Sequence, residues 1–156
     1  MIPIAHYLLA AALSNFMSIQ KCQEWADLRI DRADQPEDWL LDVSISRNIS
    51  TLRDAIEPRF EKEKQSLSNS LISDVIIGYY YIMYEDGKIT IPELLKMAGA
   101  EADGGQSELE CEDIYAVLNL LEGERSEIHK INESLDQLFG DCKILALKQW
   151  EAIETF

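Results

Sequence analysis

Apolar residues recur at helical spacing along most of the chain, and the clearest case is the segment 71–84. One side of a helix through this segment, at i, i+3, i+4, i+7 and i+11, would carry Ile72, Val75, Ile76, Tyr79 and Met83. Other large apolar residues cover the remaining positions, which is typical of a helix at the centre of a domain. Gly78 is then predicted to let a neighbouring helix approach closely.

The amino-terminal segment, residues 3–28, is predicted to form one long helix, or two that meet near Ser14 and Asn15. The polar residues 31–35 end it. Pro36 begins the next helix, with acidic residues in the first turn, where they oppose the positive end of the helix dipole. The apolar residues of this helix are Trp39, Leu40, Val43 and, at its end, Ile45.

A further helix is predicted to start near Thr51. Pro58 should break or kink it, because proline lacks a backbone donor and clashes with the preceding turn. The densely charged segment 59–65 is predicted to be a solvated helix face.

Two capping boxes mark helix starts in the second half of the chain. Thr90 with Glu93 opens a short helix that Gly99 is predicted to close. After a glycine-containing acidic loop, Ser107 with Glu110 opens another, whose apolar stripe is Ile114, Val117, Leu118 and Leu121.

Two more apolar stripes follow towards the carboxyl terminus. The first runs from Ile128 to Phe139 and is predicted to stop at Gly140. Asp141 can cap the last helix, whose apolar residues are Ile144, Leu147, Trp150 and Ile153.

A β-hairpin is the alternative for residues 80–91, because Asp86-Gly87 is a good type I′ turn. The five residues at helical spacing before it favour a helix. With no internal repeat or low-complexity linker, the sequence predicts an all-α fold of about seven helices in one compact domain, residues 1–156.

The composition narrows the class of protein. The chain has 156 residues, and 14 lysines and arginines oppose 29 aspartates and glutamates, so the net charge is −15. The apolar content of 47% excludes a disordered tail. The acidity argues against direct binding of nucleic acid, because phosphate binding needs a cationic surface.

The cysteines and the amino-terminal segment indicate the compartment. Cys22, Cys111 and Cys142 are odd in number and widely spaced, which predicts buried free thiols in a reducing compartment. Residues 4–19 are interrupted by polar side chains and have no basic start, so neither a membrane span nor a signal peptide is expected. The protein is predicted to be cytoplasmic and not to bind a membrane.

Residues 86–93 resemble the second half of an EF-hand calcium loop. Gly87 and Glu93 match its turn glycine and its final carboxylate. However, Ile82 and Tyr84 fall where the loop needs oxygen ligands, so no calcium site is expected there.

Other chemistry has no motif to support it. Neither His6 nor His129 has a paired histidine or an adjacent carboxylate motif. The chain has no nucleophile elbow, phosphate loop or dinucleotide fingerprint. We therefore predict no metal, no cofactor and no enzymatic activity.

The distribution of acidic residues is the remaining signal. From Glu101 to Asp113 the chain has six acidic residues and no basic one, and the turn at Glu122-Gly123-Glu124 adds two more. Acids near helix starts are expected for solubility and dipole compensation. The alternative is a docking surface for a basic protein, because opposite potentials raise association rates and fix specificity. The predicted partner-binding residues are Glu101, Asp103, Glu108, Glu112, Asp113, Glu122 and Glu124.

One stretch also carries a family resemblance. Its residues are Gln35-Pro36-Glu37-Asp38-Trp39-Leu40-Leu41-Asp42-Val43-Ser44. Together with the acidic run and the small, motif-free chain, this stretch resembles the helical immunity proteins of bacterial contact-dependent inhibition and polymorphic toxin systems. The resemblance implies a cognate toxin domain and a one-to-one inhibitory complex. A non-catalytic immunity protein that neutralises a basic toxin, such as a nuclease, is therefore expected.

Two other functions without enzymatic activity fit the same residues. One is a helical adaptor or assembly protein. The other is an inhibitor that mimics DNA, which the charge of −15 favours but which the lysines and arginines interspersed through residues 21–64 weaken. The sequence leaves the oligomeric state open.

Overall fold

All regular secondary structure in the described part of the chain is helical, as the periodicity predicts. The computed structural model describes residues 1–66, 72–123 and 128–156. Within these ranges lie eight α-helices, close to the seven expected, and no strand forms at residues 80–91. The helices are α1 Ile4–Leu13, α2 Ile19–Arg32, α3 Asp38–Ser44, α4 Ile49–Glu63, α5 Ile72–Glu85, α6 Ile91–Gly104, α7 Cys111–Glu122 and α8 Ile128–Thr155, with a 3-10 turn at Lys64–Ser66.

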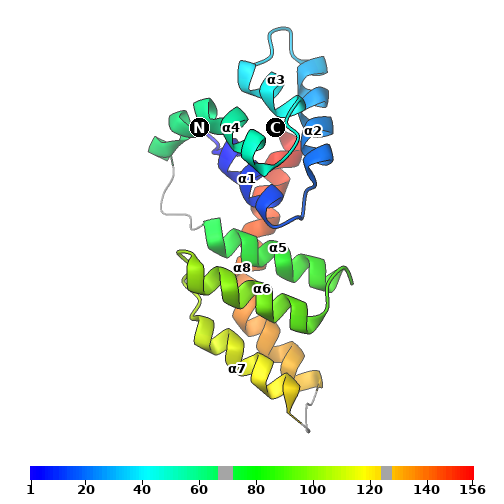
Figure 1. Ribbon diagram of the computed structural model, residues 1–156, viewed down its shortest axis with the longest axis vertical. Coiled ribbons are helices and arrows are strands. Elements are labelled where there is room, and N and C mark those ends of the chain that lie inside the picture. The colour runs from blue at the N-terminus through cyan, green and yellow to red at the C-terminus, as the bar shows by residue number, and fades with distance from the viewer. Residues whose placement is uncertain (67–71, 124–127) are drawn as a thin grey trace. The chain divides into compact units, whose positions relative to one another are not determined.

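The chain divides into two compact units, whose helices are labelled in Figure 1. Unit 1 consists of Met1–Asn69 together with Gln149–Phe156, and unit 2 is Ser70–Lys148. Helix α8 therefore contributes residues to both units. The single domain expected for residues 1–156 stays a prediction.

In unit 1 the amino-terminal segment forms two helices that separate at the predicted place. Asn15 adopts a positive φ of 59°, the left-handed conformation that asparagine tolerates better than most residues. Ser18 then caps α2 by accepting a hydrogen bond from the backbone N–H of Lys21 at 3.2 Å.

The charged segment 59–65 is not simply a solvated face, because the Glu63 side chain is completely buried. Its carboxylate accepts hydrogen bonds from the backbone N–H groups of Ala5 and His6, at 3.1 and 3.3 Å. Arg59 Nε donates to the same carboxylate at 2.8 Å. The first N–H groups of a helix have no partner within it, so Glu63 supplies α1 with the acceptors and the negative charge that its amino terminus needs.

Of the break or kink predicted at Pro58, the break is wrong, because α4 continues through this residue to Glu63. Proline removes one hydrogen bond from the helix, but the turns on both sides are fixed by other contacts. Leu52 and Ile56 are buried before the proline, and Glu63 is held by α1 after it.

The end of α8 completes unit 1. Trp25 Nε1 donates to the Ile153 carbonyl at 2.9 Å, and Arg29 donates to the carbonyls of Ile153 and Glu154 at 3.0 Å. These carbonyls lack partners within the helix, and a cation is favoured at this negative end of the dipole. Phe156 stacks on the Trp25 ring, with centroids 5.9 Å apart.

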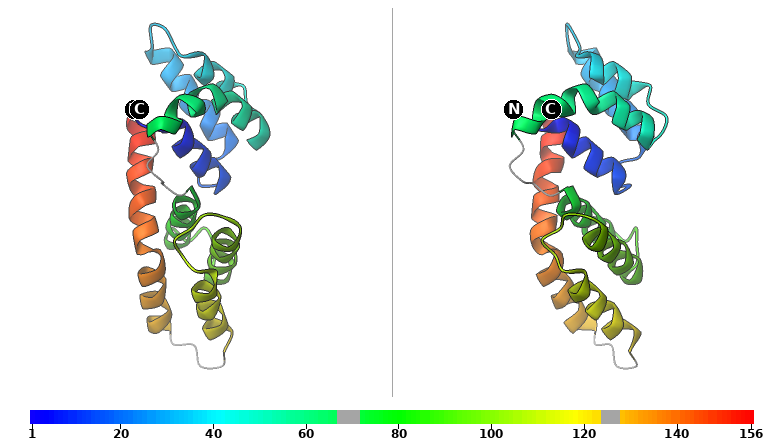
Figure 2. Two further views of the ribbon diagram at one scale, coloured as in Figure 1. Left: turned by 90° about the vertical axis from the view of Figure 1, so that its left-hand side faces the viewer. Right: turned by 60° about the vertical axis from the view of Figure 1, so that its left-hand side comes forward.

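Unit 2 is built from α5, α6, α7 and the amino-terminal part of α8, which Figure 2 shows from two further sides. Its core joins all four helices: Ile77, Tyr81, Leu94, Leu95, Ala98, Ile114, Val117, Leu118, Ile131, Leu135, Phe139 and Cys142. The prediction for Gly78 is confirmed. A Cβ atom there would overlap the backbone carbonyl oxygen of Cys142 on α8.

Two glycines predicted to end helices do not do so. Helix α6 runs through Gly99 to Gly104, and α8 runs through Gly140 and Asp141 without interruption. A Cβ at Gly99 would lie 2.6 Å from the Tyr115 ring, so this glycine provides room for α7 to pack.

The first capping box is confirmed and the second is wrong. Thr90 and Glu93 exchange the expected hydrogen bonds at 2.7 and 3.3 Å. Ser107 instead donates to the Asp74 carboxylate and accepts from the Leu109 N–H, and α7 begins later, at Cys111.

The stripe expected on the last helix also needs correction. Because α8 is continuous, its buried positions in this region are Cys142, Ala146, Gln149 and Ile153. Ile144 is 66% exposed and Leu147 is 44% exposed.

Candidate functional site

Six of the seven predicted partner-binding residues are described by the structure, and they lie in unit 2, at the end of α6, on α7 and in the segment between them. Glu101 and Asp103 lie in the last turn of α6, Glu108 lies in the connecting segment, and Glu112 and Asp113 lie in the first turn of α7. Glu122 is the last residue of α7. All are exposed except Glu101, which is half-buried. Glu124 falls outside the described residues. We call the set of Glu101, Asp103, Glu108, Glu112, Asp113 and Glu122 the acidic surface.

The carboxyl end of α6 and the amino end of α7 meet at Cys111. Its sulfur lies 3.8 Å from the Asp103 carboxylate and 3.4 Å from that of Glu112. Burial raises the pKa of the Cys111 thiol, and the neighbouring Glu112 and Asp103 carboxylates raise it further. The thiol therefore stays protonated, which disfavours a nucleophilic role.

Cys111 is also the exception to the prediction that all three thiols are buried. It is partly exposed, whereas Cys22 and Cys142 are buried. Burial raises the pKa of Cys142 to about 12, with the Asp74 carboxylate as the next largest cause. Asp74 could not be connected with these residues from the sequence, because it lies far away in the chain, on α5. It belongs beside the acidic surface, since it accepts hydrogen bonds from Ser107 Oγ and from the Glu108 N–H at 3.2 Å.

The acids at the carboxyl ends of helices are not explained by helix electrostatics. Glu112 and Asp113 start α7, where negative charge is favoured. Glu101, Asp103 and Glu122 end their helices, where the dipole disfavours negative charge by about 0.3–1 kcal/mol per residue. Neither helix has a basic residue in its last turn. In the described part of the chain, none of the six carboxylates forms an ion pair with a lysine or arginine.

Helix α7 adds exposed apolar side chains to these charges. Glu112, Ala116 and Leu120 follow one another at i, i+4 and i+8 on its exposed side, and Leu120 is 64% exposed. Tyr115 remains 36% exposed although its ring packs against Gly99. The sequence contained this signal, since Leu120 lies off the stripe formed by Ile114, Val117, Leu118 and Leu121.

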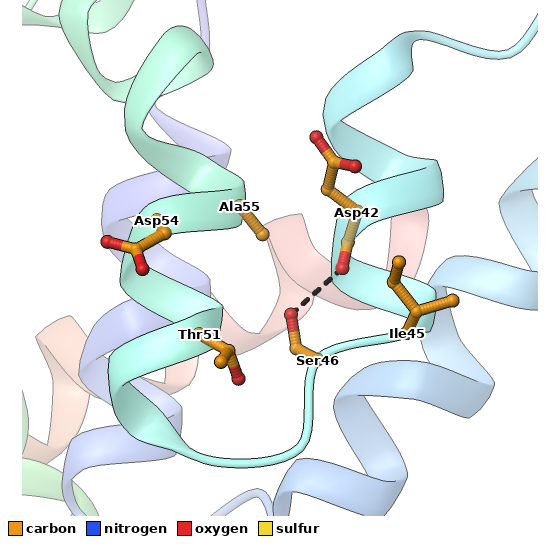
Figure 3. Close-up of a pocket in the computed structure, with 6 residues that line it drawn as sticks. All are labelled: Asp42, Ile45, Ser46, Thr51, Asp54 and Ala55. Atoms are coloured by element: carbon orange, nitrogen blue, oxygen red, sulfur yellow. Dashed lines mark hydrogen bonds between the residues drawn. The ribbon is translucent and has the colours of Figure 1, made fainter.

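A second feature lies in unit 1, where residues of α3, α4 and the segment between them line an open pocket of about 300 Å³. Figure 3 shows its lining residues: Asp42, Ile45, Ser46, Thr51, Asp54 and Ala55. Ile45 was predicted to be an apolar residue of its helix but is 72% exposed. Leu41 and Ile45 lie at i and i+4, opposite the buried Trp39, Leu40 and Val43. That pattern could have indicated an exposed apolar side.

The described ranges contain neither a cluster of metal-binding side chains nor a helix that could span a membrane. No group of three or more His, Cys, Asp or Glu side chains there converges in a way that could hold a metal ion. Among the described helices, none combines the length and apolar character needed to cross a membrane.

Comparison of the chain with protein-family models, curated proteins and solved structures found no match. The function therefore has to be inferred from the chain's own residues.

Proposed function

We propose that the protein is a non-catalytic immunity protein that binds and neutralises a basic toxin domain, such as a nuclease, through the acidic surface. The observation that carries this proposal is the set of acids at the ends of α6 and α7. Glu101, Asp103 and Glu122 oppose their own helix dipoles and have no cation beside them in the described part of the chain. A basic partner would supply the missing positive charge.

The exposed apolar residues of α7 fit a protein partner better than a simple ion. Protein interfaces combine an apolar centre with a polar rim, and large anchor residues contribute most of the binding energy. Leu120 lies on the same exposed side of α7 as Glu112 and is an anchor of this kind, and the exposed carboxylates of α7 would form part of the rim. A nuclease is a suitable class of partner because its nucleic-acid surface must be cationic.

The test compares capture of partners by the wild type and by a charge-reversed variant. The Glu108→Lys/Glu112→Lys/Glu122→Lys variant changes three exposed acids of the acidic surface. The matched control, Asp27→Lys/Asp31→Lys/Asp34→Lys, changes three exposed acids of unit 1 and shifts the net charge equally. Each protein is immobilised and exposed to lysate of the source cell at low and high salt.

The proposal expects one basic protein to be captured by the wild type and by the control but not by the acidic-surface variant. Capture should weaken at high salt, because exposed charges are screened over about 10 Å at 0.1 M. Any nuclease activity of the captured protein should then be lost on addition of one equivalent of this protein. Equal capture by both variants, or a captured enzyme that stays active, would contradict the proposal.

A helical adaptor is the second candidate, and a separate observation favours it. Ile144 and Leu147 are exposed on one side of α8, an arrangement that suits an apolar partner rather than a basic one. In that case capture should resist salt and should be lost in the Ile144→Ser/Leu147→Ser variant. The charge-reversed variant would then capture the same partner as the wild type.

A further inference from the structure

We propose that the exposed side of α8 between Gly140 and Lys148 binds the same side of α8 in a second copy of this chain, with the two helices antiparallel. These residues lie on α8, whereas the acidic surface lies on α6, α7 and the segment between them. The inference therefore goes beyond the proposed function and does not depend on it. It is carried by exposed aliphatic residues, by a glycine that the fold does not need and by the order of the charges.

The aliphatic residues lie on the side of α8 opposite the core. Cys142 and Ala146 are buried, and Ile144 lies about 160° from each of them around the helix. Ile144 is accordingly 66% exposed, and Leu147, three residues later, is 44% exposed. Covering two neighbouring aliphatic side chains with another apolar surface removes them from water, which favours association.

The glycine on this side, Gly140, has no packing role within the described part of the chain. A Cβ atom at Gly78 or Gly99 would overlap a neighbouring helix. A Cβ atom at Gly140 would meet only a carboxylate oxygen of Asp136, at 3.8 Å. Glycine is unfavourable in the interior of a helix, so a second helix that approaches Gly140 from outside would give it a role.

The order of the charges identifies this second helix as a copy of α8. Asp141 lies three residues before Ile144, and Lys148 lies four residues after it, on the same edge of the exposed side. Both are exposed, and neither forms an ion pair in the part of the chain that the structure describes. A two-fold axis at Ile144 brings equal edges together, so Asp141 of each copy would face Lys148 of the other.

The opposite edge is complementary in shape about the same axis. Gly140 lies four residues before Ile144, and Leu147 lies three residues after it. The pairing that joins the charges therefore also places Leu147 of each copy over Gly140 of the other, with the two Ile144 side chains meeting between the edges. An interface between identical copies requires a surface that complements itself, and this one does so in both charge and shape.

The dimer should be weak and reversible. The proposed contact covers about two and a half helical turns of each copy, which is small beside the roughly 1,200–2,000 Å² that stable interfaces bury. The net charge of −15 on each copy also opposes association. Self-association is therefore measured up to high protein concentration and at about 0.15 M salt, where the screening length is about 8 Å.

The experiment is sedimentation equilibrium of the intact protein over a range of concentrations, which gives the dissociation constant of the dimer. Asp141→Lys and Lys148→Asp each place like charges opposite one another in the proposed pair. The controls, Asp34→Lys and Lys96→Asp, make the same changes of charge at exposed positions on other elements. Circular dichroism checks that every variant keeps its helical content.

The wild type should dimerise reversibly, and Asp141→Lys and Lys148→Asp should each raise the dissociation constant about tenfold, whereas the controls should not change it. An equimolar mixture of Asp141→Lys and Lys148→Asp should form mixed dimers more tightly than either variant forms its own, because both ion pairs are then present. The mixture of the two controls should show no such gain. A wild type that stays monomeric at every concentration, or single variants that dimerise as well as the wild type, would overturn the proposal. A mixture that gains nothing would overturn the antiparallel pairing.

Discussion

The two units use their charged residues in different ways. In unit 1 charge connects elements: buried Glu63 joins α4 to α1, and Arg59 also reaches Glu37 beside α3 at 3.1 Å. In unit 2 an apolar core joins the four helices, and the six acids of the acidic surface make no ion pair among the described residues. Unit 2 has six lysines and arginines against sixteen aspartates and glutamates, a net −10, whereas unit 1 has eight against thirteen, a net −5.

This difference separates charges that the fold needs from charges that it does not. Removing Glu63 should damage unit 1, whereas removing the acidic surface should leave unit 2 intact. The tryptophans allow the units to be followed separately, since Trp25, Trp39 and Trp150 all lie in unit 1. Tryptophan fluorescence therefore reports on unit 1, and circular dichroism reports on both units.

The largest effect is expected from Glu63→Ala. It leaves the Arg59 guanidinium and the first N–H groups of α1 without their buried acceptor, which should lower the free energy of unfolding by about 3–5 kcal/mol. Urea unfolding followed by tryptophan fluorescence measures the loss. The control is Glu61→Ala, which removes an exposed carboxylate paired with Lys64 and should lower the free energy of unfolding far less than Glu63→Ala does. Equal losses in the two variants would show that the burial of Glu63 contributes no stability.

Gly78→Ala should be the strongest single change in unit 2. The added methyl would overlap the Cys142 carbonyl, and overpacking of this kind costs about 1–3 kcal/mol. Circular dichroism should show an early unfolding phase, while the tryptophan transition stays in place. Gly104→Ala is the matched control, because a Cβ there meets no atom within 4 Å. If both probes shift together in Gly78→Ala, the two units unfold as one domain.

The acid sensitivity of unit 1 should come partly from Glu63. Burial alone would raise the pKa of Glu63, but hydrogen bonds from His6, Ala5 and Arg59 outweigh burial and lower it. Because the pKa of Glu63 is lower in the folded state, the stability that this residue contributes is present above about pH 4.3, the ordinary pKa of glutamate. That contribution is lost as the pH falls through the pKa of the folded state.

The measurement is the difference in unfolding free energy between the wild type and Glu63→Gln at a series of pH values. The advantage of the wild type should be largest near neutral pH and should shrink below about pH 4.3. A difference that does not change with pH would show that Glu63 has the same pKa in the folded and unfolded chain.

The smallest effect on stability is expected from Glu108→Lys/Glu112→Lys/Glu122→Lys. All three side chains are exposed, so the unfolding free energy should change by less than about 1 kcal/mol. A small gain would follow from reduced repulsion in a strongly negative unit. Thermal unfolding followed by circular dichroism checks this, and an unfolded variant would show that the acids are needed by the fold.

The helices of the core could be predicted from local pattern alone. The stripe from Ile72 to Met83 and the box at Thr90 and Glu93 each depend on residues within a few turns, and both are confirmed. The role of Gly78 could be predicted as well, because a residue without a side chain in an otherwise bulky apolar helix leaves room for the backbone of a neighbouring helix.

The errors arose where distant residues decide local structure. Pro58 does not end α4, and Glu63 is buried, because α1 lies against this part of the chain. Ser107 binds Asp74, which lies 33 residues earlier, instead of capping the nearest helix. Gly99 accommodates Tyr115 instead of ending α6. None of these partners can be identified from spacing along the sequence.

The acidic surface was predictable in composition but not in arrangement. The run from Glu101 to Asp113 is visible in the sequence, whereas the meeting of Asp103 and Glu112 at Cys111 depends on how α6 and α7 pack. The pocket beside Ile45 was missed because an exposed isoleucine looks like a core residue in a hydrophobic pattern.

The hydrogen bonds from Trp25 and Arg29 to the end of α8 have a consequence for biosynthesis. Unit 1 cannot complete its packing until the ribosome has made residues 149–156, by which point every residue of unit 2 has already been translated. Unit 2 is continuous in the sequence and can close first. Until then, the nascent amino-terminal half keeps part of its apolar surface uncovered. This interval is the stage of synthesis at which the chain is most exposed to aggregation and to chaperone binding.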